Sequence, residues 1–422
     1  MMSVRGFRRG ARVANGGLRR WWWACRARQA GAVTLAGCPL STAEECRHFK
    51  FIGTTGAGKS TAIRELLTKA LARGDRAVIA DPDGSYCARF LDEWRGDAVL
   101  GPFGGARWDP FSELREVYDA EHLAAALVAT SADAAAAEWR EYARTLLAAL
   151  LGRCAPAARG LAELWRLLAV ASPQELRAVL AGTPAEPFLE PENARMFGSI
   201  RAIAVSAARG LEFVRHQRSR GFCIRDWVRC GRGALFIPYR ARQIAALRGL
   251  IAAWMGLAIF ETLSGQEEQD QRLWFVVDEL DALGAIHGLK DALARLRRFG
   301  GRCVLGFQSI AQVSGTYGQA EAQTLVENCG NTLILRCSSS EQGGTAQFAS
   351  RLIGERERLR RQVLRGRDHG GLLALARRST QVSEQTLVEA AVMASELEQL
   401  PDLTGYLRTA CSPVWYRVRL RR

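Results

Sequence analysis

Short apolar runs alternate with stretches of helical spacing near residue 50. His48–Ile52 is a short apolar run that stops at a glycine-rich turn, and Thr61–Arg73 repeats its apolar residues with the spacing of a helix. Ala77–Ala80 has the composition of a buried strand, and the turn sequence Asp81–Gly84 follows it. Strand, loop, helix and strand in this order predict the opening of a parallel α/β domain.

Residues 113–215 have a different pattern. They are rich in alanine, leucine and arginine, and they contain almost no β-branched runs. Helical periodicity is found in Ala134–Gly152, Leu161–Ala169 and Ala194–Arg215. This segment is therefore predicted to form an all-α domain.

Strand and helix signals alternate again after residue 216. Apolar strands are predicted at Ala234–Ile237, Leu273–Val277, Cys303–Phe307 and Thr332–Leu335. Helices are predicted between them at Arg242–Leu263, Gly288–Phe299 and Ala320–Asn328. The predicted fold class is therefore α/β, with a mostly parallel sheet and an inserted all-α domain. The two parts of the α/β domain are predicted at residues 46–112 and 216–422, with the insert at 113–215.

The first 45 residues do not share these patterns. Residues 1–50 hold nine arginines and one lysine against Glu44 and Glu45, which gives a net charge of +8. Trp21–Trp23 lie in this segment, which has no sustained periodicity. We predict a basic, poorly ordered N-terminal arm over residues 1–45. A surface that meets nucleic acid or lipid headgroups is the alternative.

The composition of the whole chain is that of a basic protein with reduced cysteines. Lysine and arginine total 58 against 43 acids, a net charge of +15, which favours polyanionic partners such as nucleic acid or an anionic membrane face. Eleven scattered cysteines without a C-x-x-C pair favour reduced core residues over a disulfide framework. No stretch of 18 apolar residues occurs, and Leu250–Leu263 has the length of a core helix, so we predict a soluble chain without a transmembrane span.

A glycine-rich motif follows the first predicted strand. It matches G-x-x-x-x-G-K-[ST] with the residues Gly53, Thr54, Thr55, Gly56, Ala57, Gly58, Lys59, Ser60 and Thr61. The glycines let backbone N–H groups curl around a phosphate, and the helix that begins near Lys59 points its positive dipole end at the same phosphate. Lys59 reaches the β- and γ-phosphates, and Ser60 offers a hydroxyl to Mg²⁺, with Thr61 as a weaker candidate. The motif predicts ATP and Mg²⁺ as cofactors, against the alternative of a glycine-rich turn with an exposed lysine.

Two acids follow another buried strand. Asp278 and Glu279 come directly after Leu273–Val277, where the strand meets a loop. Asp278 would order Mg²⁺ through its water shell, and Glu279 would position and activate the attacking water. An adjacent acid of this kind favours hydrolysis over transfer to a small acceptor.

Three further residues are candidates for the same reaction. Gln308 lies just past an apolar strand, where its amide can hydrogen-bond the γ-phosphate or the water; an ordinary polar residue at a strand end is the alternative. Arg297 and Arg298 precede the next strand, where one of them could project into the nucleotide of a neighbouring subunit as an arginine finger. The alternative for the two arginines is a solvated helix C-terminus.

Several segments together resemble one family. They are Arg47-His48-Phe49, Asp81–Gly84, Trp108–Phe111, Ile224–Trp227, Asp278–Leu280, Arg298–Gly301 with Gln308, Val392–Glu396 and Leu400–Leu407. Over roughly residues 46–422 the chain resembles the cytosolic part of the type IV secretion coupling proteins, the TraD/TrwB-like conjugative DNA-transfer ATPases. The resemblance is specific because unrelated segments recur in the right order.

This resemblance implies a RecA-like P-loop NTPase that assembles as a homo-hexamer. Its DNA-stimulated ATP hydrolysis would move DNA without regard to sequence and link a relaxase–DNA complex to a type IV secretion channel. Carried over residue by residue, Lys59 and Ser60 are the phosphate and Mg²⁺ contacts, Asp278 and Glu279 the acid pair, and Gln308 the sensor. Either Arg297 or Arg298 is the trans arginine finger.

One departure from the family concerns the membrane. Family members normally carry two membrane-spanning helices well upstream of the phosphate loop, at the cytoplasmic face of the bacterial inner membrane. Here the loop begins at residue 53 and no span precedes it. We therefore expect membrane attachment only through a missing or separate anchor, and a soluble, cytoplasmic chain by itself.

Two other functions stay open. Another hexameric ATPase, such as a chromosomal DNA translocase or a secretion motor, would share the catalytic parts, and only the helical insert and the C-terminal motifs favour the conjugative type. An inactive nucleotide-binding adaptor that docks a relaxase is the alternative from a different class. Intact Lys59, Ser60, Asp278 and Glu279 argue against it.

Overall fold

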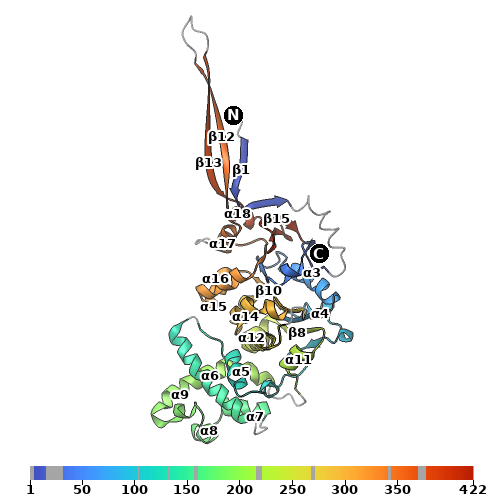
Figure 1. The fold of residues 1–422 in the computed structure, drawn as a ribbon. Coiled ribbons are helices and arrows are strands. Elements are labelled where there is room, and N and C mark those ends of the chain that lie inside the picture. The colour runs from blue at the N-terminus through green and yellow to red at the C-terminus, as the bar shows by residue number, and fades with distance from the viewer. Residues whose placement is uncertain are drawn as a thin grey trace.

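A ten-stranded sheet forms the centre of the computed structural model, which describes residues 4–15, 32–102, 104–131, 133–155, 160–214, 221–267, 271–340, 344–368 and 377–421 (Figure 1). In spatial order its strands are β2 (Arg12–Asn15), β15 (Val414–Arg419), β14 (Thr404–Arg408), β11 (Asn331–Ile334), β5 (Phe49–Ile52), β10 (Gly301–Phe307), β9 (Leu273–Val277), β6 (Arg76–Pro82), β8 (Ala234–Tyr239) and β7 (Ala98–Val99). The strands from β11 to β7 run parallel to one another, whereas β14 is antiparallel to both of its neighbours. The carboxyl ends of β5, β9 and β10 therefore meet at one edge.

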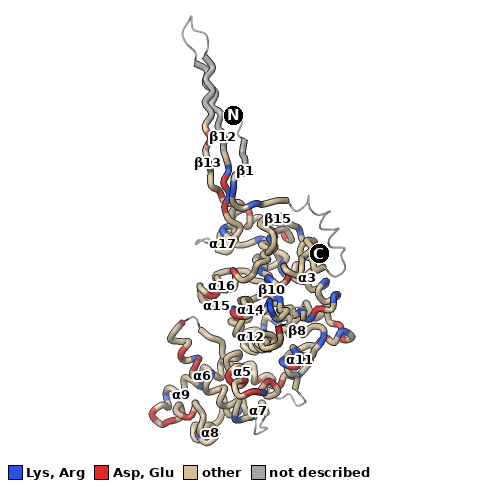
Figure 2. The backbone as a smooth tube through the Cα atoms, in the orientation of Figure 1, with Lys and Arg blue, Asp and Glu red and all other residues tan. Residues whose placement is uncertain are grey.

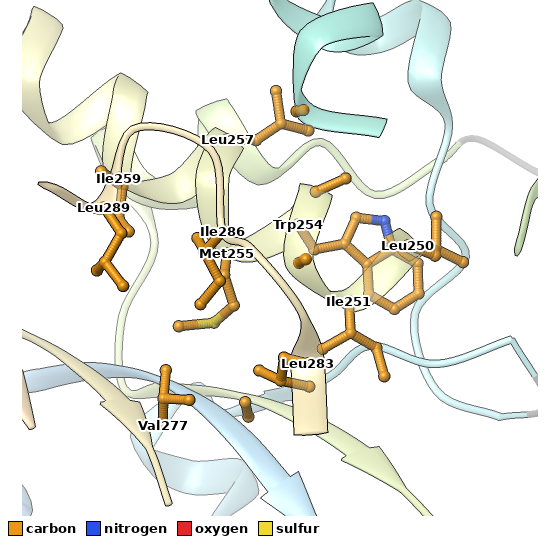
Figure 3. Close-up of a cluster of buried hydrophobic side chains, with 14 of the residues drawn as sticks. Leu250, Ile251, Trp254, Met255, Leu257, Ile259, Val277, Leu283, Ile286 and Leu289 are labelled. Atoms are coloured by element: carbon orange, nitrogen blue, oxygen red, sulfur yellow. The ribbon is translucent and has the colours of Figure 1, made fainter. Parts of the chain in front are cut away.

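Both faces of the sheet are buried, which explains the continuous apolar runs of its strands. In β6, Ala77 and Ile79 join the hydrophobic cluster on the face covered by α3 (Lys59–Ala72), and Val78 and Ala80 join the cluster on the opposite face. The second cluster is centred on α12 (Ala241–Ser264), whose side chains meet those of Val277 and Leu289 (Figure 3).

The other helices of the α/β part are short. They are α2 (Thr42–Glu45), α4 (Cys87–Phe90), α11 (Ile224–Cys230), α13 (Leu280–Leu283), α14 (Leu289–Arg295), α15 (Ile310–Tyr317), α16 (Gln319–Asn328), α17 (Gly344–Ile353) and α18 (Ala394–Glu398). Short 3₁₀ turns are η2 (Glu93–Arg95) and η6 (Leu296–Phe299), so the helix predicted at Gly288–Phe299 changes type after Arg295. Two two-residue strands, β3 (Thr34–Leu35) and β4 (Cys38–Pro39), form a separate small sheet.

Residues 113–215 form the helical block at the end of the molecule opposite the long hairpin (Figure 1). Its elements are α5 (Asp119–Leu127), α6 (Ala134–Cys154), α7 (Gly160–Ala169), α8 (Pro173–Leu180), α9 (Ala194–Ala207) and α10 (Gly210–Val214), with 3₁₀ turns η3 (Pro110–Glu113), η4 (Glu186–Leu189) and η5 (Pro191–Asn193). The single helix predicted at Ala194–Arg215 is thus two helices, α9 and α10. This block interrupts the α/β part between β7 and β8, as the sequence predicted.

The prediction of a poorly ordered arm over residues 1–45 is wrong where the structure describes that segment. β1 (Val4–Gly10) pairs with a strand of the long hairpin, and β2 extends the main sheet beside β15. α2 begins with a capping box in which Ser41 and Glu44 satisfy each other's backbone N–H groups. The error has a physical cause, since β2 is only four residues long and its buried and exposed positions do not alternate. Trp21–Trp23 lie outside the described residues.

A long hairpin projects from the body of the protein (Figure 1). Its strands are β12 (Glu355–Asp368) and β13 (Arg377–Ala390), and β1 pairs with β12 to complete a three-stranded sheet. The sequence analysis did not predict this hairpin, because β12 begins with alternating acidic and basic residues in place of an apolar run.

The helix α12 is long and apolar enough to cross a membrane by length and composition, and among the described residues it is the one helix with that property. It packs inside the protein against α5, α11 and the strands β6 and β8. Met255, Ala258 and Ile259 are almost fully buried in these contacts. Its apolar sequence is therefore accounted for by the protein core.

Candidate active site

The phosphate loop connects the central strand β5 to the helix α3. Gly56 and Gly58 have φ angles of 76° and 121°, values that side-chain-bearing residues rarely adopt. A Cβ atom on Gly58 would also lie 2.9 Å from Leu403 Cδ2, so glycine is needed there for two reasons. The loop is anchored at its start, where Thr54 N donates to Arg336 O at 2.8 Å. The free N–H groups of the first turn of α3 open beside this loop, which makes an anion site.

Lys59 is folded over the phosphate loop. Its Nζ donates to Gly53 O at 2.7 Å and to Thr54 O at 3.2 Å, and the residue is buried. Burial lowers the pKa of Lys59, while the nearby Asp278 and Glu279 act in the opposite direction. The ammonium group is thus held between the loop and the acid pair, and the alternative of an exposed lysine in a plain turn is excluded.

The acid pair stands at the carboxyl end of β9. Asp278 Oδ2 accepts a hydrogen bond from Ser60 Oγ at 2.6 Å, which joins β9 to the phosphate loop. Asp278 Oδ1 is buried and has no hydrogen-bond partner. Glu279 is half-buried, and burial, with Asp278 and Asp281 nearby, raises its pKa.

Gln308 follows β10 and bridges the two motifs. Its Oε1 accepts from Thr55 Oγ1 at 2.8 Å, and its Nε2 donates to Glu279 Oε1 at 3.4 Å. Because β5, β9 and β10 are neighbours in the sheet, their carboxyl ends bring Thr55, Glu279 and Gln308 into one hydrogen-bonded set. These residues are far apart in the sequence and were predicted from their positions after apolar strands.

The residues around Asp278 fit a magnesium ion. The orphaned Oδ1 of Asp278 and the hydroxyl of Ser60 are oxygen atoms of the kind that Mg²⁺ prefers. Among the residues that the structure describes, no group of three His, Cys, Asp or Glu side chains could hold a metal by itself. An ion here would therefore need oxygens from a nucleotide and from water, which is the usual arrangement for Mg²⁺.

The structure does not bring Arg297 and Arg298 to this set. Both side chains are exposed on η6, at the start of β10, and Arg298 Nη1 lies 3.9 Å from Glu267 Oε1. Gln308 stands at the other end of the same strand. Its seven residues span about 23 Å at roughly 3.3 Å each, so neither arginine reaches the phosphate loop of its own chain.

Sequence reasoning missed two contributions to the site. Tyr86 donates its hydroxyl to Asp278 Oδ2 at 2.8 Å. The C-terminal segment covers the phosphate loop, because Leu403 N donates to Ala57 O at 2.9 Å. Leu403 lies within Leu400–Leu407, one of the segments that carry the family resemblance, but nothing in that segment indicated contact with the phosphate loop.

Comparisons with known proteins support this picture. The sequence model of the family described as "Type IV secretion-system coupling protein DNA-binding domain" matches residues 32–421. Coupling protein TraD of Escherichia coli K12 is 32% identical over 392 residues, which are 89% of this chain and 52% of that protein. Protein VirD4 of Rhizobium rhizogenes is 28% identical over 118 residues, 28% of this chain and 17% of that protein. The chain thus spans about half the length of TraD and a smaller part of VirD4.

Solved structures agree in fold. The unbound form of the conjugative coupling protein TrwBdeltaN70 superposes with a TM-score of 0.86 and 32% identity, over 99% of this chain and 94% of that one. TrwB in complex with the ATP analogue ADPNP gives a TM-score of 0.85 over the same shares. The predicted fold class, a RecA-like P-loop NTPase with a mostly parallel sheet and an inserted all-α domain, is confirmed, as is the resemblance on which it rested. This chain belongs to the family of type IV secretion-system coupling proteins.

Proposed function

We propose that this chain is an ATP-hydrolysing DNA translocase that links a relaxase–DNA complex to a type IV secretion channel in conjugative transfer. One observation carries the proposal. The phosphate loop, the acid pair and Gln308 form a single hydrogen-bonded set at the carboxyl edge of the sheet. Nucleotide hydrolysis requires these groups together.

Each residue of the proposed active site has a separate role. Backbone N–H groups of the loop and of the first turn of α3 bind the phosphates, and Lys59 adds a positive charge there. Ser60 and Asp278 hold Mg²⁺, which neutralises phosphate charge when bound. Glu279 takes the proton of the attacking water, and its raised pKa suits that task. Gln308 contacts both Thr55 and Glu279, so it is placed to respond to the γ-phosphate.

The relatives support ATP and Mg²⁺ as cofactors. TrwB has been solved with ADPNP and with ADP and Mg²⁺, and each of these structures is 32% identical over 99% of this chain. These structures contain TrwB, and we propose the same cofactors for this chain.

Sequence-nonspecific DNA is the proposed cargo. Basic and acidic positions are interspersed along the described chain (Figure 2). The helical segment 113–215 holds thirteen acidic and eleven basic residues, so the net charge of +15 arises outside it. We therefore place the DNA contacts on the α/β part, and we keep 46–112, 113–215 and 216–422 as the proposed domain boundaries.

Assembly as a homo-hexamer gives Arg297 and Arg298 a role. They lie too far from their own phosphate loop to act there, which supports an arginine finger supplied to a neighbouring subunit. Relaxase and channel proteins are the remaining proposed partners, at the cytoplasmic face of the inner membrane.

DNA-stimulated ATP hydrolysis by the purified chain tests the proposal. Hydrolysis that requires Mg²⁺, rises with added DNA and is lost in Lys59→Ala supports the motor. ATP binding without hydrolysis would instead establish the nucleotide-dependent adaptor, and hydrolysis that is indifferent to DNA would favour a related ring ATPase with another cargo.

A further inference from the structure

The turn after β6 places Tyr86 in the active site. The carboxylate of Asp81 accepts hydrogen bonds from Tyr86 N at 2.9 Å and from Cys87 N at 2.7 Å, so the backbone at Tyr86 is fixed. Asp81 is itself fully buried at the end of its strand. The turn sequence Asp81–Gly84 thereby sets where the tyrosine side chain enters the protein.

The ring of Tyr86 is held as firmly as its backbone. It is fully buried in the hydrophobic cluster that includes Ile63 and Val276. The guanidinium of Arg64, on α3, lies 5.7 Å from the ring centroid. A tyrosine buried in this way has its hydroxyl position determined by packing.

The hydroxyl of Tyr86 contacts Asp278, the acid that is proposed to hold Mg²⁺. It donates to Asp278 Oδ2 at 2.8 Å, the same oxygen that accepts from Ser60 Oγ. Asp278 Oδ1 remains buried without a donor. Two donors on one oxygen fix the plane of the carboxylate and leave the other oxygen available to Mg²⁺ or to a water molecule of its shell.

We propose that Tyr86 is a positioning residue that orients the Asp278 carboxylate for magnesium. The inference rests on the proposed function and deepens it. Ser60 is itself a proposed ligand, whereas Tyr86 donates to Asp278 without being a proposed ligand. Outer partners of this kind typically change metal affinity by about 10- to 100-fold when they are removed.

The chain offers a matched control in Tyr239. This second buried tyrosine ends the neighbouring strand β8, and its backbone O accepts from Asp83 N at 2.7 Å. Its hydroxyl has no hydrogen-bond partner. Tyr86→Phe and Tyr239→Phe thus remove the same atom from two neighbouring buried sites, but only Tyr86→Phe removes a hydrogen bond to Asp278.

The experiment is a Mg²⁺ titration of fluorescent ADP binding by the full chain, with ADP binding in EDTA measured in parallel. Tyr86→Phe should raise the half-saturating Mg²⁺ concentration by about tenfold or more and leave ADP binding in EDTA unchanged. Tyr239→Phe should leave both values unchanged. In an Asp278→Asn background, adding Tyr86→Phe should have no further effect, because the two act as one unit.

Three results would overturn the inference. They are a Tyr86→Phe half-saturation within twofold of wild type, an equal shift in the Asp278→Asn background, and a loss of ADP binding in EDTA, which would show that Tyr86 serves packing. If the wild-type chain itself binds no ADP with Mg²⁺, the proposed function fails first, so the two failures are distinguishable.

Discussion

Thr55 and Gln308 stand 253 positions apart in the sequence, and a 2.8 Å hydrogen bond joins their side chains. Thr55 belongs to the phosphate loop, and Gln308 also donates to Glu279. The amide is therefore a bridge between the loop that would grip the phosphates and the acid that would activate water. One side chain thus contacts both the phosphate loop and the acid pair.

Glu279→Gln should abolish hydrolysis and retain nucleotide binding. The amide has nearly the size of the carboxylate but cannot take a proton, so turnover should fall by about 100-fold or more. Steady-state ATPase and fluorescent-nucleotide binding measure the two effects separately. Glu192→Gln, on the exposed turn η5, is the control and should have no effect. Wild-type turnover in Glu279→Gln would show that another group is the base.

The pH dependence of turnover should report the environment of Glu279. Burial raises the pKa of this carboxyl above its ordinary value of 4.5, and Asp281 contributes in the same direction. The base works only when deprotonated, so turnover should rise with pH through the raised pKa and then level off. Asp281→Asn removes one of the nearby negative charges and should move this rise in turnover to lower pH. A rise that stays at the same pH in Asp281→Asn would contradict the assignment of Glu279 as the base.

Exchange of subunits should reveal the arginine finger. Lys59→Ala chains keep both arginines but cannot use their own site, whereas Arg297→Ala/Arg298→Ala chains keep the site and lack the arginines. Each variant alone should be nearly inactive, since a finger is worth about 10³- to 10⁵-fold. Mixing them should restore turnover at shared interfaces. No rescue at any ratio would remove the trans model.

DNA affinity should depend steeply on salt. Arginine contacts with phosphates release counterions, so the dissociation constant should rise more than about tenfold between roughly 50 and 200 mM salt. Fluorescence anisotropy with two DNA duplexes of unrelated sequence measures both the slope and the lack of sequence preference. A dissociation constant that stays flat across this range would count against phosphate-dominated binding.

A buried ion network around Glu45 should contribute strongly to stability. Glu45 accepts from Arg73 Nη1 at 2.9 Å and Nη2 at 2.8 Å, and from Arg302 Nε at 3.3 Å, with almost no solvent exposure of Glu45 or Arg302. Glu45→Ala leaves the buried guanidinium of Arg302 without its carboxylate partner, while Arg73 keeps Asp75, and should lower the free energy of unfolding by ~3–5 kcal/mol. Urea denaturation measures it. Glu141→Ala, which breaks the surface pair with Arg144, is the control and should change the urea midpoint little.

The core of the site was predictable because parallel strands impose a simple rule. Lys59, Asp278 and Gln308 each follow an apolar run, and the carboxyl ends of such strands share an edge. No comparable rule locates Tyr86, which reaches Asp278 from a turn and a four-residue helix. Its partner lies 192 positions away, so only the folded geometry identifies the pair.

The missed parts of the fold have a different cause. The strands β1 and β12 are rich in arginine, and they pair through backbone hydrogen bonds that are independent of side-chain type. The prediction of a single helix at 194–215 was wrong because of tertiary packing. The stretch 194–215 has uniform helical spacing, but Gly210 comes so close to Leu250 that a Cβ atom would lie 2.6 Å from Leu250 Cβ. That packing constraint belongs to the tertiary structure.

The position of β5 in the sheet has a consequence for synthesis of the protein. β5 ends at Ile52, yet its two neighbours are β10, which begins at Gly301, and β11, which begins at Asn331. At translation rates of roughly 5–20 residues per second, the strand waits on the order of 10–50 s for its first partner. Leu403, which covers the loop at Ala57, emerges later still. The phosphate loop thus leaves the ribosome well before the segments that enclose it.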